Sequence, residues 1–308
     1  MKDTTDDNAQ RAIEMNARGA ELYGQGDYKA ATAAFTEAIA LSPQPEWAFY
    51  FNRGRARNDQ GDLPGAIADY TEALRLNPQH AQAYRRRGAA RSQQGDLEGA
   101  LADFDADVRL QPNAYSYTNR GYAYLYTGDI EKALADFNEA LRPELGNPED
   151  NRARLYSGRG QAYLLRRAYE QAIADFSVAI QSAPDNGRYY YQRSCAYRLH
   201  GDYDQAIADL DEAIRLQPAM AIAYNDRGFM WRQKGNLTRA LADYDEAIRL
   251  DPHNALFYES RGVTYGMQGQ EAKTAADFQK VLQIDPQFAN AGKLRVWLAQ
   301  HDSNPHQG

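Results

Sequence analysis

The chain has 308 residues, 43% of them hydrophobic and 25% charged, and its formal net charge is −7 at pH 7. A chain of this length can bury an apolar core, and its negative charge disfavours general binding to nucleic acid or to an anionic membrane surface. The single cysteine, Cys195, excludes an internal disulfide and a cysteine zinc cluster, and the five histidines are scattered without metal-site spacing. We expect neither a metal nor another cofactor.

The N-terminal segment, residues 1–11, is acidic and lacks the apolar core of a secretory signal. No apolar run reaches the length of about 18 residues that a membrane-spanning helix needs. We therefore expect a cytoplasmic protein without a membrane partner.

From residue 12 onward, one pattern of small and polar residues recurs about every 34 residues. In the second copy the pattern consists of Arg53, Gly54, Gly61, Asp62, Ala66 and Pro78. The glycine that follows the arginine marks the register of every copy except the sixth, which has a serine there. These markers are Gly19, Gly54, Gly88, Gly121, Gly160, Ser194, Gly228 and Gly262.

Each copy predicts a hairpin of two helices. In the second copy, the stretch "AFYFNRGRARNDQ" ends at Gly61, and "LPGAIADYTEALRL" follows Asp62. Glycine favours the C-terminal end of a helix and aspartate caps an N-terminal end, so the Gly-Asp pair predicts a turn between helices. One such hairpin cannot bury its apolar face alone, and the copies must therefore stack on one another.

The period and its pattern of aromatic, Gly, Ala and Pro residues resemble the tetratricopeptide repeat. The resemblance implies an all-α fold, a right-handed superhelix, or α-solenoid, of antiparallel helix hairpins. It implies no particular function. Eight copies are expected to form one solenoid over residues 12–288, with the bounds 12–46, 47–80, 81–113, 114–152, 153–186, 187–220, 221–254 and 255–288.

Two segments depart from the repeat. The fourth copy contains an insertion, residues 142–151, in which Pro143 is expected to end a helix early. We interpret it as a loop that leaves the stacking intact; the alternative is a joint between the first four and the last four copies. Residues 289–301 predict an amphipathic capping helix whose Leu294 and Trp297 or Leu298 pack back, and residues 302–308 a disordered tail.

An arginine and an aspartate lie equally far from the turn glycine of each hairpin, which places them at the same height on antiparallel helices. These pairs are Arg53/Asp69, Arg87/Asp103, Arg120/Asp136, Arg159/Asp175, Arg193/Asp209, Arg227/Asp243 and Arg261/Asp277. A guanidinium fork and a carboxylate match geometrically, so a ladder of structural ion pairs is one interpretation. Catalysis is the other, but it requires one differentiated site rather than a repeated one. The pattern favours the ladder and a protein that is not an enzyme.

A binding function must then reside on a surface. The resemblance implies that the first helix of each copy lines a concave wall, and helical spacing selects the side chains that face it. The middle of this wall is basic and aromatic, which suits an extended peptide, an acidic one in particular. The candidate peptide contacts are Asn52, Arg55, Arg85, Arg86, Asn119, Tyr122 and Arg154. The alternative is that these residues only keep an open groove solvated.

Two binding devices of the family are only partly matched. The carboxylate clamp keeps Arg85, Asn119 and Arg154, but Ala89 and Gly158 leave two of its five places empty. A ladder of asparagines that grips a peptide backbone is also interrupted.

We interpret the sequence as a non-enzymatic protein–protein interaction scaffold that binds a peptide segment of a protein partner. The alternative is a structural assembly module that self-associates through its convex face or its ends, which would make it a homo-oligomer.

Overall fold

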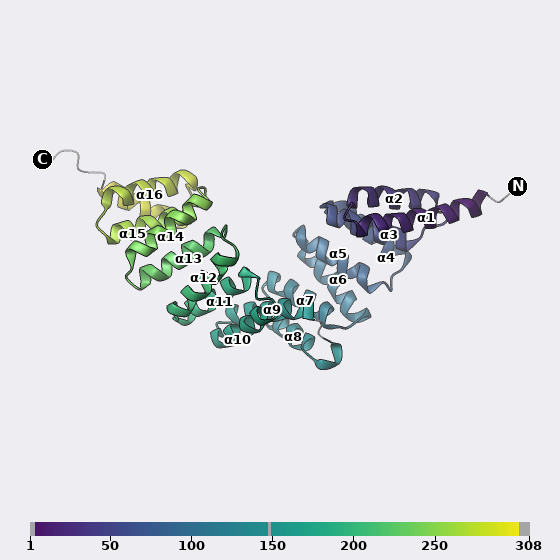
Figure 1. Cartoon of the computed structure of the whole chain (residues 1–308), viewed down its shortest axis with the longest axis horizontal. Helices are drawn as coiled ribbons and strands as arrows, with labels where there is room; N and C mark the ends of the chain where they lie inside the picture. Colours follow the sequence, from purple (N-terminus) through teal and green to yellow (C-terminus); the bar gives the residue numbers. More distant parts are fainter. Residues whose placement is uncertain (1–3, 147–148, 302–308) are drawn as a thin grey trace. The chain divides into compact units, whose positions relative to one another are not determined.

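A computed structural model describes residues 4–146 and 149–301, and within these ranges the chain is helical, with no strand (Figure 1). The predicted all-α solenoid is confirmed. In chain order the helices are α1 (Thr4–Gly24), α2 (Tyr28–Leu41), α3 (Trp47–Gln60), α4 (Leu63–Leu76), α5 (Ala81–Gln93), α6 (Leu97–Leu110), α7 (Ala114–Thr127), α8 (Ile130–Ala140), the 3-10 helix η1 (Pro143–Leu145), α9 (Glu149–Leu165), α10 (Tyr169–Ser182), α11 (Gly187–His200), α12 (Tyr203–Leu216), α13 (Ala221–Gln233), α14 (Leu237–Leu250), α15 (Ala255–Met267), α16 (Glu271–Ile284) and α17 (Ala291–His301).

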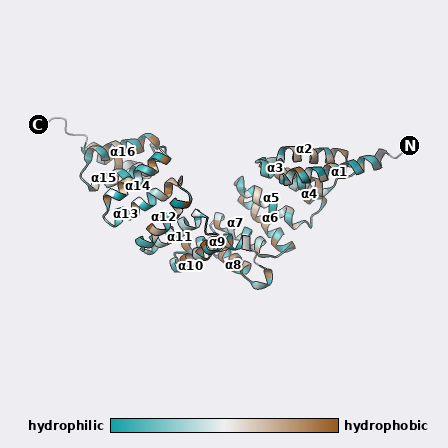
Figure 2. Cartoon of the chain, viewed as in Figure 1, coloured by the Kyte–Doolittle hydropathy of each residue, from teal (hydrophilic) through white to brown (hydrophobic). Residues whose placement is uncertain are grey.

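The helices belong to two compact units, residues 1–162 and residues 163–308. In each unit, consecutive helices pack as hairpins, and the second helix of one hairpin packs against the first helix of the next. Apolar and polar residues are interspersed along the helices (Figure 2). Within the described residues, no helix combines the length and the apolar composition that crossing a bilayer requires.

Helix ends follow the capping residues of the sequence. Asp62 caps α4 by accepting a hydrogen bond from the amide of Gly65 at 3.0 Å, and Gly61 ends α3 in a left-handed conformation with φ of 91°. A residue with a side chain is strained at such a φ, which explains why glycine occupies this place in most copies. Arg167 occupies it in the fifth copy, and its φ is 63°.

Several bounds differ from the segments that the sequence suggested. Helix α1 begins at Thr4, inside the acidic segment 1–11. Helix α8 has 11 residues, whereas α2 and α4 have 14, and η1 starts at Pro143 in the expected insertion. The expected tail, residues 302–308, lies outside the described residues.

In most hairpins a small residue on the first helix faces a ring on the second, whereas the sixth copy has Leu210 in the place of the ring. A Cβ at Gly54 would lie 2.8 Å from Cε1 of Tyr70, so only glycine permits this approach. Alanines such as Ala66 and Ala73 are completely buried beside the ring. The small residues therefore set the distance between the helices, and the rings fill the space that remains.

The six Arg–Asp pairs whose two members lie in one unit are confirmed as bidentate ion pairs. In each, Nε and Nη2 of the arginine donate to the two carboxylate oxygens at 2.6–3.0 Å. The aspartates are at most 7% exposed. The remaining nitrogen, Nη1, reaches back to the second helix of the preceding copy. Its acceptors for Arg53, Arg87, Arg120, Arg193, Arg227 and Arg261 are Thr36, Thr71, Asp105, Ser177, Asp211 and Asp245.

Candidate ligand-binding surface

The candidate contacts lie on the first helices of unit 1. These are α1, α3, α5, α7 and the part of α9 up to residue 162. First helices of consecutive hairpins contact one another directly, because α1 touches α3, α3 touches α5 and α5 touches α7. We call the surface that these first helices share the inner face of unit 1. All seven candidate contacts are on these helices, but the structure divides them into separate groups.

The first group joins Asn119, Tyr122 and Arg154. Nη1 of Arg154 donates a hydrogen bond to Oδ1 of Asn119 at 2.7 Å, and its guanidinium lies 4.8 Å from the centre of the Tyr122 ring. The Tyr122 hydroxyl in turn donates to the backbone carbonyl of Arg154 at 2.7 Å. Arg154 is exposed and the other two are partly exposed. Three residues from two consecutive copies therefore form one polar and aromatic patch.

The second group surrounds Asn52 and Arg55 on α3. Nδ2 of Asn52 donates to Oδ1 of Asn16 on α1 at 3.0 Å. The Arg55 guanidinium stacks 4.4 Å from the centre of the Tyr23 ring, and the Tyr23 hydroxyl donates a short hydrogen bond to Asp59. Burial raises the pKa of Tyr23, and the hydrogen bond to Asp59 adds to the shift. The group therefore links the first two hairpins.

Arg86 on α5 differs from the residues of these two groups in its contacts. It is partly buried, and it forms no hydrogen bond or ion pair with any residue in the described part of the chain. Its charge acts on the hydroxyl of Tyr70, a residue of α4. Among the described residues, Arg86 is therefore a cation of the inner face without a counter-ion.

Arg85, its neighbour in sequence, is held by an acid of the same hairpin. Nε and Nη2 of Arg85 donate to the Asp107 carboxylate at 2.8 and 3.1 Å. Asp107 is completely buried, and burial raises the pKa of its carboxyl group while Arg85 pulls it down. A buried carboxylate needs such a partner, so the Arg85 guanidinium is already committed to a structural role.

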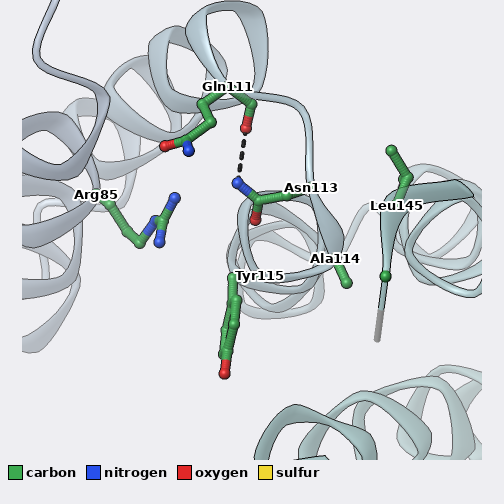
Figure 3. A pocket seen from close by; sticks show the side chains of 7 residues that line it. Arg85, Gln111, Asn113, Ala114, Tyr115 and Leu145 are labelled. Carbon is green, nitrogen blue, oxygen red and sulfur yellow. Dashed lines mark hydrogen bonds between the residues drawn. The ribbon is translucent and has the colours of Figure 1, made fainter. Parts of the chain in front are cut away.

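Arg85 also lines a pocket of about 490 Å³ (Figure 3). Its wall includes Gln111, Asn113, Tyr115 and Leu145. Nδ2 of Asn113 donates to the backbone carbonyl of Gln111 at 2.9 Å, which fixes the loop between α6 and α7. The pocket lies at a loop between hairpins, whereas Arg86 lies near the middle of the inner face.

The ion pair between Arg85 and Asp107 could have been predicted from the sequence. Asp107 stands 19 residues after the marker Gly88, a place that holds alanine or valine in the other copies. The residues in this place are Ala38, Ala73, Asp107, Ala140, Ala179, Ala213, Ala247 and Val281. An acid in a place that requires a small apolar residue predicts a buried carboxylate, and a buried carboxylate predicts a nearby arginine.

Unit 2 has polar residues on its first helices as well. The Tyr191 hydroxyl donates to Asp226 at 3.0 Å, and Nη1 of Arg232 donates to the backbone carbonyl of Ser260 at 3.4 Å. Burial raises the pKa of Cys195, and the Asp226 charge adds to the shift. A thiol with a raised pKa is a poor nucleophile at neutral pH, so this cysteine lacks the environment of a catalytic one.

Comparison with family models identifies the class of protein. The model of the tetratricopeptide repeat matches residues 118–187, 191–255 and 232–287, and a second TPR repeat model matches residues 54–95. The chain therefore belongs to the tetratricopeptide repeat family, whose members are generally non-enzymatic scaffolds that bind protein partners. No curated protein matches the chain in sequence.

Solved structures of the same family resemble it in fold. A tetratricopeptide repeat protein from Parabacteroides merdae is 22% identical, with a TM-score of 0.65 over 83% of this chain and 99% of that chain. The C-terminal part of a TPR repeat-containing protein from Cytophaga hutchinsonii is 16% identical, with a TM-score of 0.57 over 79% and 98%. YrrB, described as a TPR protein with an unusual peptide-binding site, is 24% identical, with a TM-score of 0.50 over 63% and 97%. At these identities the likeness shows the fold alone.

Proposed function

We propose that this protein binds an extended peptide segment of a protein partner on the inner face of unit 1 and acts as a non-enzymatic scaffold. The patch of Asn119, Tyr122 and Arg154 carries the proposal. It combines an amide, an aromatic ring and a guanidinium, and Arg154 and Tyr122 belong to the residue types that dominate binding hot spots. Tyr126, also on α7, is 66% exposed and adds an aromatic surface beside it.

The family resemblance supports the proposal without defining the ligand. YrrB is described as having a peptide-binding site, and it shares the hairpin stack with this chain. An extended peptide offers backbone donors and acceptors along its whole length, and Asn52 and Asn119 can meet both kinds because an amide side chain donates and accepts. Arg55, Arg86 and Arg154 favour a peptide with acidic residues. Arg85 contributes through the buried Asp107, by holding α5 in place.

A random-peptide display library tests the proposal. The immobilised full chain is expected to select peptides, and isothermal titration calorimetry gives their Kd. Replacing Asn119→Ala together with Arg154→Ala should weaken the selected peptides about tenfold or more, because charge-assisted hydrogen bonds at an interface are lost.

Arg109→Ala is the matched control, because Arg109 is exposed on the second helix α6 and has no partner within the described residues. The control should bind the peptides like the parent protein. Selected peptides that bind the double variant with unchanged Kd, or a library that yields no binder, would contradict the proposal.

A further inference from the structure

Three large apolar side chains are exposed on α15, the first helix of the eighth copy. Leu256 and Val263 are each 38% exposed, and Met267 is 58% exposed. No other helix among the described residues exposes more than one large hydrophobic side chain. Single exposed apolar residues are common on protein surfaces, whereas a group of them indicates a contact surface.

The three side chains lie on one side of α15. They follow one another at intervals of seven and four residues, which a helix with 3.6 residues per turn brings to the same side. Ser260, four residues after Leu256, lies on this side as well. We call Leu256, Ser260, Val263 and Met267 the α15 stripe. The stripe contains no charged residue and is about 16 Å long, because a helix rises 1.5 Å per residue.

The packing of a hairpin does not require this stripe. No other copy has three residues of the types Leu, Ile, Val or Met in the four corresponding places. In the third copy these places hold Gln82, Arg86, Ala89 and Gln93, and in the sixth they hold Arg188, Gln192, Cys195 and Leu199. Because the other copies form the same hairpin without it, the stripe has a cause outside the hairpin.

The neighbouring first helix supports the stripe. Helix α13 contacts α15 and adds Ile222 and Phe229, which are both partly buried (Figure 1). The Arg232 guanidinium lies 5.1 Å from the centre of the Phe229 ring, and its Nη1 donates to the backbone carbonyl of Ser260 at 3.4 Å. Arg232 therefore connects α13 to α15 beside the stripe and helps to hold both helices in place.

We propose that the α15 stripe is the contact between two copies of this chain, with the two α15 helices antiparallel across a two-fold axis. Such a contact uses the same patch on both copies, so the patch must be complementary to itself. The spacing of the stripe is symmetric, and antiparallel pairing places Leu256 opposite Met267 and Ser260 opposite Val263. The smaller side chains then meet in the centre and the longer ones at both ends. This inference goes beyond the peptide site of unit 1 and does not depend on it.

The chemistry of the stripe favours a second copy over a charged partner. A partner that is selected by charge needs opposite charges on the surface, and the stripe offers none. Interfaces between identical copies are also more apolar than transient ones. Two chains with a net charge of −7 repel each other, but salt at about 0.15 M screens charges beyond about 8 Å and leaves the apolar contact unchanged.

The size of the stripe predicts a weak dimer. Three large side chains from each copy bury less area than a standard protein interface. We therefore expect dimers at about micromolar concentration or above, and monomers below it. Analytical ultracentrifugation of the full chain in a concentration series measures this equilibrium. The average mass should rise from that of a monomer towards that of a dimer as the concentration increases.

Val263→Lys should raise the dissociation constant of the dimer about a hundredfold or more, because two lysines enter an apolar contact without counter-ions. Met267→Lys, at the end of the stripe, should act in the same direction. Both residues are exposed, so the melting curve in circular dichroism should stay close to that of the parent chain.

Leu199→Lys is the matched control. Leu199 is 44% exposed on α11, a first helix of the same unit, and lies outside the stripe. This variant should dimerise like the parent chain. A parent chain that stays monomeric throughout the concentration series, or a Val263→Lys variant that dimerises as tightly as the parent, would overturn the proposal.

Cross-linking tests the antiparallel arrangement. Leu256→Cys and Met267→Cys are prepared separately, each with Cys195→Ser to remove the native thiol, and are treated with a bis-maleimide that is shorter than the stripe. An equal mixture of the two variants should give cross-linked dimers, because the two thiols meet at one end of the pair. Either variant alone should not, because its two thiols lie at opposite ends, about 16 Å apart along the helix. Cross-links in the single variants and none in the mixture would exclude this arrangement.

Discussion

Single arginines connect three helices in this protein. Arg120, for example, donates two hydrogen bonds to Asp136 in its own hairpin and one to Asp105 in the preceding hairpin, at 2.7–2.8 Å. The guanidinium has five N–H donors in a fixed plane, so it can serve both acceptors without changing its rotamer. Burial raises the pKa of Asp136 against the pull of Arg120. The carboxylate is therefore a costly group that the fold tolerates only because the arginine is present.

Removing the buried carboxylate of Asp136 should lower the free energy of unfolding much more than removing the exposed carboxylate of Asp105. Asp136→Ala leaves the Arg120 guanidinium partly buried without its bidentate partner, and we expect a loss of about 3–5 kcal/mol in the free energy of unfolding. Asp105→Ala removes a partner that is 51% exposed, and its cost should stay below about 1 kcal/mol. Urea denaturation followed by circular dichroism measures both. Equal losses in the two variants would show that the buried pair has no special role.

Two single residues, Asp107 and Tyr70, differ from the residues that most other copies have at the same place in the repeat. Asp107 stands where other copies have a small apolar residue and pairs with Arg85, whereas Tyr70 stands where most copies have phenylalanine and its hydroxyl has no hydrogen-bond partner among the described residues. The buried Asp107 carboxylate is compensated by Arg85 in the same hairpin, so this ion pair holds α5 against α6. Tyr70 adds a buried hydroxyl without a hydrogen-bond partner among the described residues, as Tyr244 does in the seventh copy.

At the scale of the element, every hairpin depends on a residue with positive φ between its helices. Seven copies use glycine there, with φ between 71° and 101°, and the fifth uses Arg167 with φ of 63°. A side chain destabilises this conformation, whereas glycine adopts it freely. The turn that follows α9 is therefore strained where the other turns are relaxed.

Arg167→Gly should stabilise the protein. Relief of the left-handed strain, about 1–2 kcal/mol, exceeds the entropy that an extra glycine adds to the unfolded chain, so we expect a net gain of up to about 1 kcal/mol. The reciprocal change, Gly201→Ala, introduces the strain in the next copy and should cost about 1 kcal/mol. Both are measured as shifts of the urea midpoint. A destabilised Arg167→Gly variant would mean that the arginine side chain makes a contribution larger than its backbone strain.

At the scale of the whole molecule, each unit gains stability as hairpins cover one another, and an uncovered end exposes apolar surface. In unit 2, α17 covers the last hairpin. Leu294 is buried against Phe278 and Val281, and Trp297 meets Phe278 edge-on with ring centres 5.2 Å apart. Leu294 and Trp297 therefore pack back on the last hairpin, and Leu298 packs against the same cluster.

Ending the chain after Asn290 should destabilise unit 2 strongly. The truncation removes Leu294 and Trp297 and exposes the apolar side of α16, which amounts to about 3 kcal/mol or more because each large buried side chain contributes about 1.5–3 kcal/mol. We expect a lower melting temperature and increased light scattering on heating. A chain that ends after His301 keeps α17 and is the control. If both truncated chains melt like the full chain, α17 is not a cap.

The sequence alone predicted the order of the helices, the turns and the six Arg–Asp pairs that lie within one unit, although not every helix bound. These features depend on the position of a residue within its own hairpin, and the repeated register with its Gly and Asp caps defines that position. The tertiary structure decided which candidate contacts are available. Arg85 and Arg86 are adjacent in the sequence, yet Asp107 holds Arg85 while Arg86 has no counter-ion in the part of the chain that the structure describes, because pairing depends on distances between side chains of different helices. The same reason makes the Asn119–Arg154 contact and the unsatisfied Tyr70 hydroxyl visible only in the packed hairpins.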